Sequence, residues 1–289
     1  MSAVFGPAGS AESFKDMGYK KSTQLPEYLA KFGLTHFEYQ CGQGVRVTQK
    51  AAEEIGDVFK KAGMTLSLHA PYFISLSGTD EEKRMNSVNY IIAAGKAAHA
   101  MGARRIVIHS GSCAKISRTE ALELARDTMK KAKEALDREG LEDIICCPET
   151  MGKVNQLGTL EEVIEICKVH ETFLPTVDFG HLNARTFGGI KGAEDYRKML
   201  DMMENGLGAD RAAVFHSHFS KIEFTVPGGE KRHVTFEDCG GFGPEYEPLM
   251  EEIYRRGWSP VIICESAGTQ TEDAAKMQEF YRGLAHGDQ

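Results

Sequence analysis

The chain has 289 residues, a formal net charge of −8 and a hydrophobic content of 42%. This length fits one (β/α)8 barrel or two smaller domains, and the acidic charge argues against a surface that coats DNA. The N-terminus has no basic region before an apolar core, and no stretch reaches the roughly 18 apolar residues of a membrane span. Seven scattered cysteines without CxxC spacing indicate free thiols, so we expect a cytoplasmic protein without membrane contact.

Eight short apolar runs, spread over the whole chain, predict strands. The runs lie near Ala3–Phe5 and at Phe37–Gln40, Thr65–His69, Arg104–His109, Asp143–Glu149, Pro175–Asp178, Ala212–His218 and Pro260–Glu265. Apolar residues at helical spacing predict helices between the runs, and Thr159 with Glu162 is a capping box. These helices are Glu81–Met101, a helix from Ser117 or Thr119 past Ala132, Thr159–Cys167, Tyr196–Met203, Tyr246–Tyr254 and Glu272–Tyr281.

A strand followed by a helix, repeated along the chain, predicts an α/β fold with its parallel sheet closed into a single (β/α)8 TIM barrel. A doubly wound open sheet is the second possibility. No composition shift or linker marks a domain boundary, so one domain over residues 1–289 is expected. The longest irregular stretch is Lys221–Pro244, which is rich in glycine and charge, and a loop of this length usually has a function.

Six of the run ends carry side chains that can bind a metal ion. They are His69, His109, Glu149, Asp178, His218 and Glu265. The C-terminal ends of barrel strands open at one face, so these side chains would converge there. Each one alone also fits a plainer role, as a hydrogen-bonded structural histidine or as a buried carboxylate paired with arginine or lysine. The whole set predicts a metal site at the barrel mouth, because imidazole and carboxylate suit zinc, manganese or iron.

Three histidines and three carboxylates suffice for two divalent ions that share a bridging carboxylate. Two such ions about 3.5–4 Å apart can stabilise the attacking and leaving oxygens of a phosphoryl displacement, and they can lower the pKa of a bound water. The same ligand types can instead hold one ion against the hydroxyl and carbonyl oxygens of a sugar. The ligand set by itself leaves both chemistries open.

The order of these residues, continued by two further histidines, resembles endonuclease IV, the zinc-dependent apurinic/apyrimidinic endonuclease. The resemblance covers essentially the whole chain and includes His69-x-x-Tyr72 with Ile74-Ser75-Leu76, His109-x-Gly111-Ser112, the glycine-containing loop after Glu149, Asp178-x-x-His181 and His233. It implies a TIM barrel of the xylose-isomerase-like superfamily that uses three zinc ions to cleave DNA 5′ to an abasic site. The chain looks like a divergent branch of this family.

The resemblance also implies how the ligands divide over the ions. The sets are His69, His109 and Glu149 for the first, Glu149, Asp178, a histidine of the seventh run and Glu265 for the second, and His181 with His233 for the third. Glu149 would bridge the first two ions and act with Glu265 as a catalytic carboxylate. The seventh run offers two histidines. His218 is favoured because its spacing to His233 matches the family, and His216 is the alternative ligand or an outer group.

The chain departs from the endonuclease IV pattern in two places. Residues His218–Lys221 read His-Phe-Ser-Lys, where the family has His-x-Asn-Asp. Residues Lys231–His233 read Lys-Arg-His, where the family has Asp-x-His with both end residues on the third zinc. A protonated lysine cannot ligate zinc. Either Glu230 or Glu237 replaces the missing carboxylate, or the third site is weak or absent.

Several loop residues at the same face are candidates for substrate contacts. Tyr72 and Phe73 would stack in the gap left by a flipped nucleotide, or they simply cap the barrel mouth. Arg46 lies in a glycine-containing loop that can approach a phosphate closely. Lys221 and Arg232 would add positive charge for an anionic substrate.

Three functions remain open from the sequence. The first is a metal-dependent phosphodiesterase of DNA repair, a monomer that hydrolyses damaged double-stranded DNA at abasic sites with two zinc ions, with or without a third, or with manganese. The second is a metal-dependent sugar isomerase or epimerase, favoured by the acidic charge and by the missing aspartate of the third site. The third is a barrel that binds a metal or ligand without catalysis, since a fold alone does not fix a function.

Overall fold

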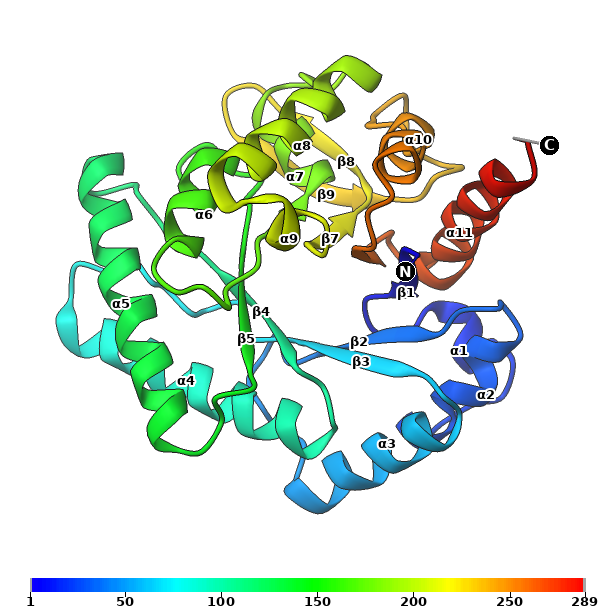
Figure 1. Ribbon diagram of the computed structural model, residues 1–289, viewed down its shortest axis with the longest axis horizontal. Coiled ribbons are helices and arrows are strands. Elements are labelled where there is room, and N and C mark those ends of the chain that lie inside the picture. The colour runs from blue at the N-terminus through cyan, green and yellow to red at the C-terminus, as the bar shows by residue number, and fades with distance from the viewer. Residues whose placement is uncertain (1, 288–289) are drawn as a thin grey trace.

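A closed ring of eight parallel strands forms the centre of the computed structural model, which describes residues 2–287 (Figure 1). The strand order is β1-β10-β7-β6-β5-β4-β3-β2, and a parallel bridge between Ala8 and Glu38 joins the two outer strands. The predicted (β/α)8 TIM barrel is therefore confirmed. A doubly wound sheet is excluded, because such a sheet keeps two open edges.

Each barrel strand overlaps one of the eight predicted runs. The strands are β1 (Val4–Pro7), β2 (His36–Gln40), β3 (Thr65–His69), β4 (Arg105–His109), β5 (Ile145–Glu149), β6 (Thr176–Asp178), β7 (His216–Phe219) and β10 (Val261–Cys264). The ring closes tightly between β1 and β2 at Gly6. A Cβ at this position would lie 2.2 Å from the backbone oxygen of His36, so only glycine fits the seam.

The helices surround the barrel, and every predicted helix is present. They are α1 (Glu12–Asp16), a 3-10 helix (Ser22–Gln24), α2 (Leu25–Ala30), α3 (Gln49–Lys61), α4 (Glu81–Ala100), α5 (Arg118–Arg138), α6 (Leu160–Cys167), α7 (Phe179–Arg185), α8 (Ala193–Leu207), α9 (Ala209–Ala212), α10 (Glu247–Arg256) and α11 (Gln270–Gly287). The capping box at the start of α6 is confirmed, since Thr159 Oγ1 accepts from the Glu162 amide and Glu162 accepts from the Thr159 amide.

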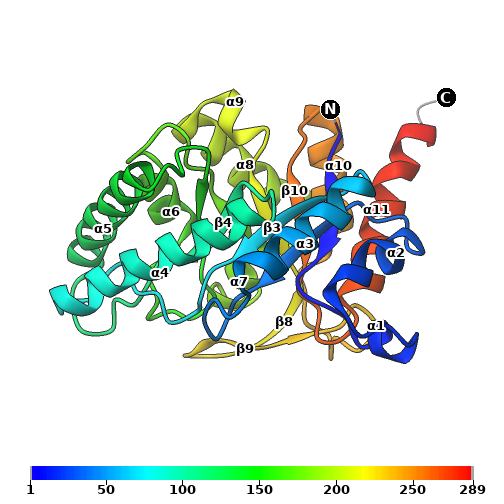
Figure 2. The same cartoon turned by 90° about the horizontal axis from the view of Figure 1, so that it is seen from below.

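The stretch Lys221–Pro244 is more regular than expected, because its first half forms a β-hairpin. Strands β8 (Lys221–Thr225) and β9 (Gly229–Val234) pair in antiparallel register. Their charges stabilise the pair instead of opposing it, since Lys231 and Arg232 both bind the Glu223 carboxylate. Figure 2 shows this hairpin at one end of the barrel, with the N-terminus at the opposite end. The hairpin therefore lies beside the C-terminal ends of the strands.

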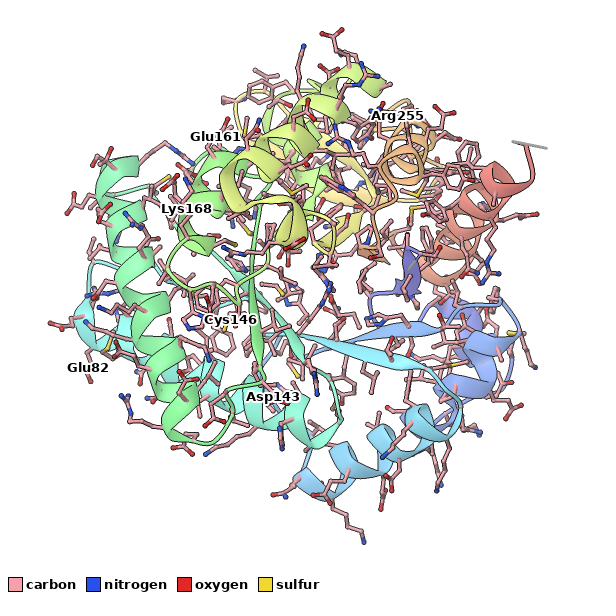
Figure 3. All side chains as sticks on the ribbon, viewed as in Figure 1. Glu82, Asp143, Cys146, Glu161, Lys168 and Arg255 are labelled. Atoms are coloured by element: carbon pink, nitrogen blue, oxygen red, sulfur yellow. The ribbon has the colours of Figure 1, made fainter. Side chains whose placement is uncertain are left out.

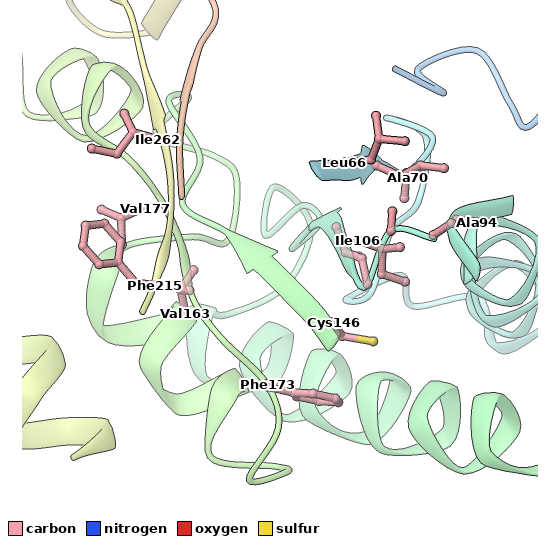
Figure 4. Close-up of a cluster of buried hydrophobic side chains, with 14 of the residues drawn as sticks. Leu66, Ala70, Ala94, Ile106, Cys146, Val163, Phe173, Val177, Phe215 and Ile262 are labelled. Carbon is pink, nitrogen blue, oxygen red and sulfur yellow. The ribbon is translucent and has the colours of Figure 1, made fainter. Parts of the chain in front are cut away.

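The apolar core fills the layer between the strands and the helices. Figure 4 shows Leu66, Ile106 and Cys146 of the strands in this layer with Ala94 of α4 and Val163 of α6. Figure 3 shows charged side chains such as those of Glu82 and Arg255 extending from the outer helices. None of the helices within residues 2–287 combines the length and apolar character that a membrane span requires.

The inside of the barrel is unusually polar. Side chains of a strand alternate between two faces, so the residues next to the outward-facing Phe37, Leu66 and Leu68 point inward. Barrel interiors are mostly filled by branched aliphatic residues. Here the inward positions of β2, β3 and β7 hold His36, Glu38, Gln40, Thr65, Ser67, His69, His216 and His218. These side chains need hydrogen-bond partners within the barrel.

Candidate metal centre

Glu149, at the end of β5, lies at the centre of the converging side chains. Its Oε2 atom is 3.4 Å from His69 Nε2 and 3.3 Å from His109 Nε2. Its Oε1 atom is 3.0 Å from His218 Nδ1 and 3.5 Å from His181 Nδ1. One carboxylate thus contacts histidines from four different places in the chain, which is the geometry that a bridging ligand requires.

A second group combines Glu149 with the ends of the next strands. Ligand atoms of Glu149, Asp178, His218 and Glu265 all lie within 4.8 Å of one another. Asp178 ends β6 and also caps α7, because its Oδ1 accepts the amide of His181 at 2.7 Å. His218 Nδ1 lies 3.5 Å from Glu265 Oε1. The other oxygen of Asp178, Oδ2, faces the group and lies 3.1 Å from His181 Nδ1.

A third group forms between α7 and the hairpin. His181 Nε2 lies 3.5 Å from Glu230 Oε2, and His233 Nε2 lies 4.0 Å from Glu230 Oε1. Of the two carboxylates considered as replacements, Glu230 lies in the group, whereas Glu237 binds Lys276. Lys231 points away, toward Glu223. The chain therefore places a carboxylate between the two histidines despite the missing aspartate.

Of the two histidines on β7, His218 contacts the other ligand candidates and His216 lies deeper. His216 Nε2 is 2.8 Å from Glu38 Oε2, and both side chains are fully buried. Glu38 was not identified from the sequence, because the run Phe37–Gln40 was assigned as apolar. The signal was the alternation of polar and aromatic residues over His36–Gln40, which places every second side chain inside a barrel.

Three histidines present Nε2 to these groups, because their Nδ1 atoms have other partners. His69 Nδ1 donates to the Ala70 carbonyl at 2.7 Å, and His181 Nδ1 donates to the Thr150 carbonyl at 2.9 Å. His233 Nδ1 lies 2.8 Å from the Ser220 hydroxyl. Such outer hydrogen bonds orient the imidazoles of metal sites. The rings are therefore held in place within the metal-free protein.

Neighbouring charges shift the pKa values of most side chains in the centre in the direction opposite to burial. Burial alone would raise the pKa of Glu149, but His218 and the other histidines hold it well below its ordinary value. The pKa of Glu265 falls to about 2, again against burial and because of His218. Burial would lower the histidine values, yet Glu149 raises the pKa of His69 to about 8, and Asp178 and Glu230 raise that of His181 to about 9. The metal-free centre thus stores protons on its histidines.

Asp178 is the exception among the carboxylates. Burial, together with the charges of Glu265 and Glu149, raises its pKa to about 6, although His181 opposes the shift. Asp178 Oδ2 and Glu149 Oε2 are buried and make no hydrogen bond within the described residues. Leaving buried carboxylate oxygens unpaired is costly. A divalent cation would satisfy both atoms, so the residues fit a metal ion, and the imidazole and carboxylate donors suit zinc, manganese or iron.

Of the residues predicted to contact a substrate, some are exposed to solvent and one is bound to another side chain. Tyr72 is 59% exposed and Phe73 is 43% exposed, and Phe73 stacks edge-on against Tyr90 with ring centroids 4.8 Å apart. Arg46 is exposed and lines a shallow pocket of the loop after β2. Lys221, in contrast, is only 6% exposed and binds both oxygens of Glu245. Lys221 is thus held in an ion pair and offers no free charge to a substrate, in contrast to the sequence prediction.

The sequence and the fold of this chain are similar to those of several known proteins. An uncharacterized protein from Methanocaldococcus jannaschii is 28% identical over 281 residues, which are 97% of each chain. A probable endonuclease 4 from Acholeplasma laidlawii is 26% identical over 215 residues, which cover 72% of this chain and 70% of that protein. The crystal structure of a D-tagatose 3-epimerase-like protein superposes with a TM-score of 0.71, at 18% identity and 99% coverage of both chains.

The likeness to the epimerase-like structure concerns the fold, since the identity is low. A family model, in contrast, matches residues 26–284 directly from the sequence, which is nearly the whole barrel. The chain therefore belongs to the xylose isomerase-like TIM barrel family.

Proposed function

We propose that this protein is a metal-dependent phosphodiesterase that cleaves double-stranded DNA at abasic sites. The observation that carries the proposal is the presence of two neighbouring ligand groups at one barrel mouth. They are Glu149, Asp178, His218 and Glu265, and His181, Glu230 and His233. A sugar isomerase needs little more than one ion, whereas phosphoryl displacement gains from several ions around the reacting phosphate. The similarity to probable endonuclease 4 from Acholeplasma laidlawii supports the same assignment.

Zinc is the proposed metal, and manganese is the alternative. One ion would be held by His69, His109 and Glu149. A second would be held by Glu149, Asp178, His218 and Glu265. A third would be held by His181, Glu230 and His233. Ions of this kind polarise a phosphate and make water nucleophilic near neutral pH. Their positive charge would also offset the acidic mouth, which otherwise repels DNA.

Glu149 and Glu265 would have different roles in the reaction. The Glu149 side chain is 1% exposed and that of Glu265 is 16% exposed. Glu265 is therefore the carboxylate that can reach a bound substrate and orient the attacking water, while Glu149 holds the centre together. Tyr72 and Phe73 would stack where the base is missing, because base–aromatic stacking contributes about 1–3 kcal/mol per base. The enzyme would act as a cytoplasmic monomer.

The direct test is incubation of the zinc- or manganese-loaded protein with a duplex that contains one abasic site, with an intact duplex as control. We expect a single nick 5′ to the lesion. Glu265→Gln should abolish nicking while binding of the abasic duplex stays measurable. Loss of binding together with nicking in this variant would contradict the assigned role of Glu265.

A metal-dependent sugar epimerase or isomerase is the second candidate. It is favoured because two basic side chains at the mouth are already bound in ion pairs. Lys221 is bound to Glu245 and Arg232 to Glu223, so neither offers an unpaired positive charge to an anionic substrate. The same protein preparation should be tested for interconversion of a ketose with its epimer or aldose. Turnover of the sugar without nicking of abasic DNA would replace the nuclease proposal.

A further inference from the structure

The carboxylate of Glu38 lies inside the barrel, one inward-facing layer below the candidate ligands. Glu38 pairs in register with Ser67, and the next inward pair is Gln40 with His69. Glu38 is fully buried, yet donors surround both of its oxygens. Oε2 accepts from Ser67 Oγ at 2.9 Å and from His216 Nε2 at 2.8 Å. Oε1 accepts from Gln40 Nε2 at 3.2 Å and lies 2.9 Å from His218 Nε2, a close charge contact that is not aligned as a hydrogen bond.

The hydrogen bonds below Glu38 run in one direction. Ser67 has a single hydroxyl proton and donates it to Glu38, so His36 Nε2, at 3.0 Å, must donate to Ser67 Oγ. His36 Nδ1 then accepts from the Thr65 hydroxyl at 2.7 Å. This chain of donors reaches from the barrel floor to one oxygen of Glu38. It fixes the carboxylate in place and leaves the other oxygen facing His218.

His218 differs from the other histidines of the centre in the nitrogen that it presents. His69, His109 and His233 turn Nε2 toward the ligand groups. His181 lies between two groups, with Nε2 toward Glu230 and Nδ1 toward Asp178 and Glu149. His218, in contrast, turns Nδ1 toward Glu149, at 3.0 Å, and toward Glu265, at 3.5 Å. Its Nε2 atom faces Glu38 instead. The ring of His218 is fully buried, and within the described residues Glu38 is the carboxylate beside its Nε2 atom.

We propose that Glu38 is a positioning residue for the metal centre, whose negative charge beside His218 Nε2 keeps the proton of that ring on Nε2 and thereby directs Nδ1 to the metal. The inference rests on the metal centre of the proposed function and not on its substrate. Ligand atoms of Glu38, His216 and His218 also lie within 4.8 Å of one another. Both oxygens of Glu38 already accept hydrogen bonds, Oε2 from Ser67 and His216 and Oε1 from Gln40, so we assign Glu38 to positioning and not to ligation. A carboxylate behind a ligating histidine typically contributes 10- to 100-fold to metal affinity.

The test compares Glu38→Gln with Glu252→Gln. Glu252 is another buried carboxylate, bound to Arg197 and Arg255 on the outside of the barrel, so its variant controls for the general cost of losing a buried charge. Zinc affinity is measured by competition with a chromophoric chelator on the folded proteins. We expect Glu38→Gln to weaken the tightest zinc site at least tenfold and Glu252→Gln to leave it within twofold.

A second measurement uses the native protein and does not depend on the folding of a variant. Nitrogen-15 NMR of the zinc-loaded protein reports which imidazole nitrogen of His218 carries a proton. We expect a protonated Nε2 and a metal-bound Nδ1. Zinc on Nε2 would overturn the proposal, and so would unchanged zinc affinity in folded Glu38→Gln. A protein that binds zinc as expected but does not nick abasic DNA would contradict the proposed function and leave the role of Glu38 intact.

Discussion

Binding of metal to the full centre at pH 7 should release about three protons. A histidine must be neutral at the nitrogen that binds a metal, so each protonated ligand loses one proton. The pKa values of His69, about 8, and His181, about 9, mean that roughly 90% and 99% of these side chains are protonated at pH 7. The pKa of His218 is raised well above its ordinary value by Glu265, Glu38 and Glu149 despite burial, which adds the third proton.

The same protons set the pH dependence of binding. Three protons released near neutral pH make the combined affinity rise by roughly a thousandfold for each pH unit between 6 and 8. The rise becomes shallower above pH 8, where His69 is already neutral, and again above pH 9. Asp178, with a pKa of about 6, adds part of a further proton near the lower end of this range, whereas Glu149 and Glu265 contribute none, because their pKa values lie below 4.5.

Isothermal titration with zinc at pH 7, in two buffers of different ionisation enthalpy, measures the released protons directly.

The stability of the protein without bound metal should change with pH in the opposite direction to the zinc affinity. Raised histidine pKa values stabilise the fold below pH 6.5 and lose this effect as pH rises through about 8 and 9, while the depressed Glu265 stabilises above pH 4.5. The pKa values of the buried His36 and His216 fall to about 3 and 4, so these two side chains destabilise the fold increasingly as pH falls below 6.5. Chelator-treated protein should thus melt highest near pH 6.5. Release of fewer than one proton per protein would refute the reasoning.

Three further predictions concern single side chains. Glu230→Gln should lower the number of bound zinc ions by one, whereas Lys231→Gln should not, because Lys231 binds Glu223 outside the group; metal analysis after gel filtration distinguishes them. Tyr72→Ala should weaken binding of an abasic duplex several-fold with little change in the single-turnover rate or in melting temperature, since the ring is largely exposed. Thr159→Ala should cost about 1 kcal/mol of unfolding free energy in urea, by loss of the cap on α6, and leave nicking unchanged.

The sequence predicted the fold and most of the candidate ligands for one physical reason. Parallel strands of a barrel all end at one face, so a candidate ligand such as His69 or Glu265 can be recognised from its place after an apolar run. The run had to be apolar on its outward face only. This rule identified the eight strands, and it also brought together residues that are far apart in the chain.

The same rule failed where the polar side chains lie inside the strand and not at its end. Glu38 occupies the middle of β2, between two outward-facing aromatic residues, and a search for apolar runs passes over it. The hairpin was missed because its charged residues pair across strands, as Glu223 does with Arg232, and not with the rest of the fold. The orientation of His218 depends on contacts with strands far away in sequence, which no local pattern contains.

The polar interior links the stability of the barrel to the candidate centre. A core filled by aliphatic residues would tolerate rotation of a ligand ring at the mouth, because nothing below it would hold a donor in place. Here the floor of the barrel is tied by Arg105, which donates to the Val214 carbonyl at 2.9 Å, and the layer above it by His36, Ser67 and Glu38. Within this layer, His36, Ser67 and Glu38 depend on one another for their hydrogen bonds. A substitution at Ser67 should therefore be felt at the metal centre, although its side chain is a layer away from the candidate ligands.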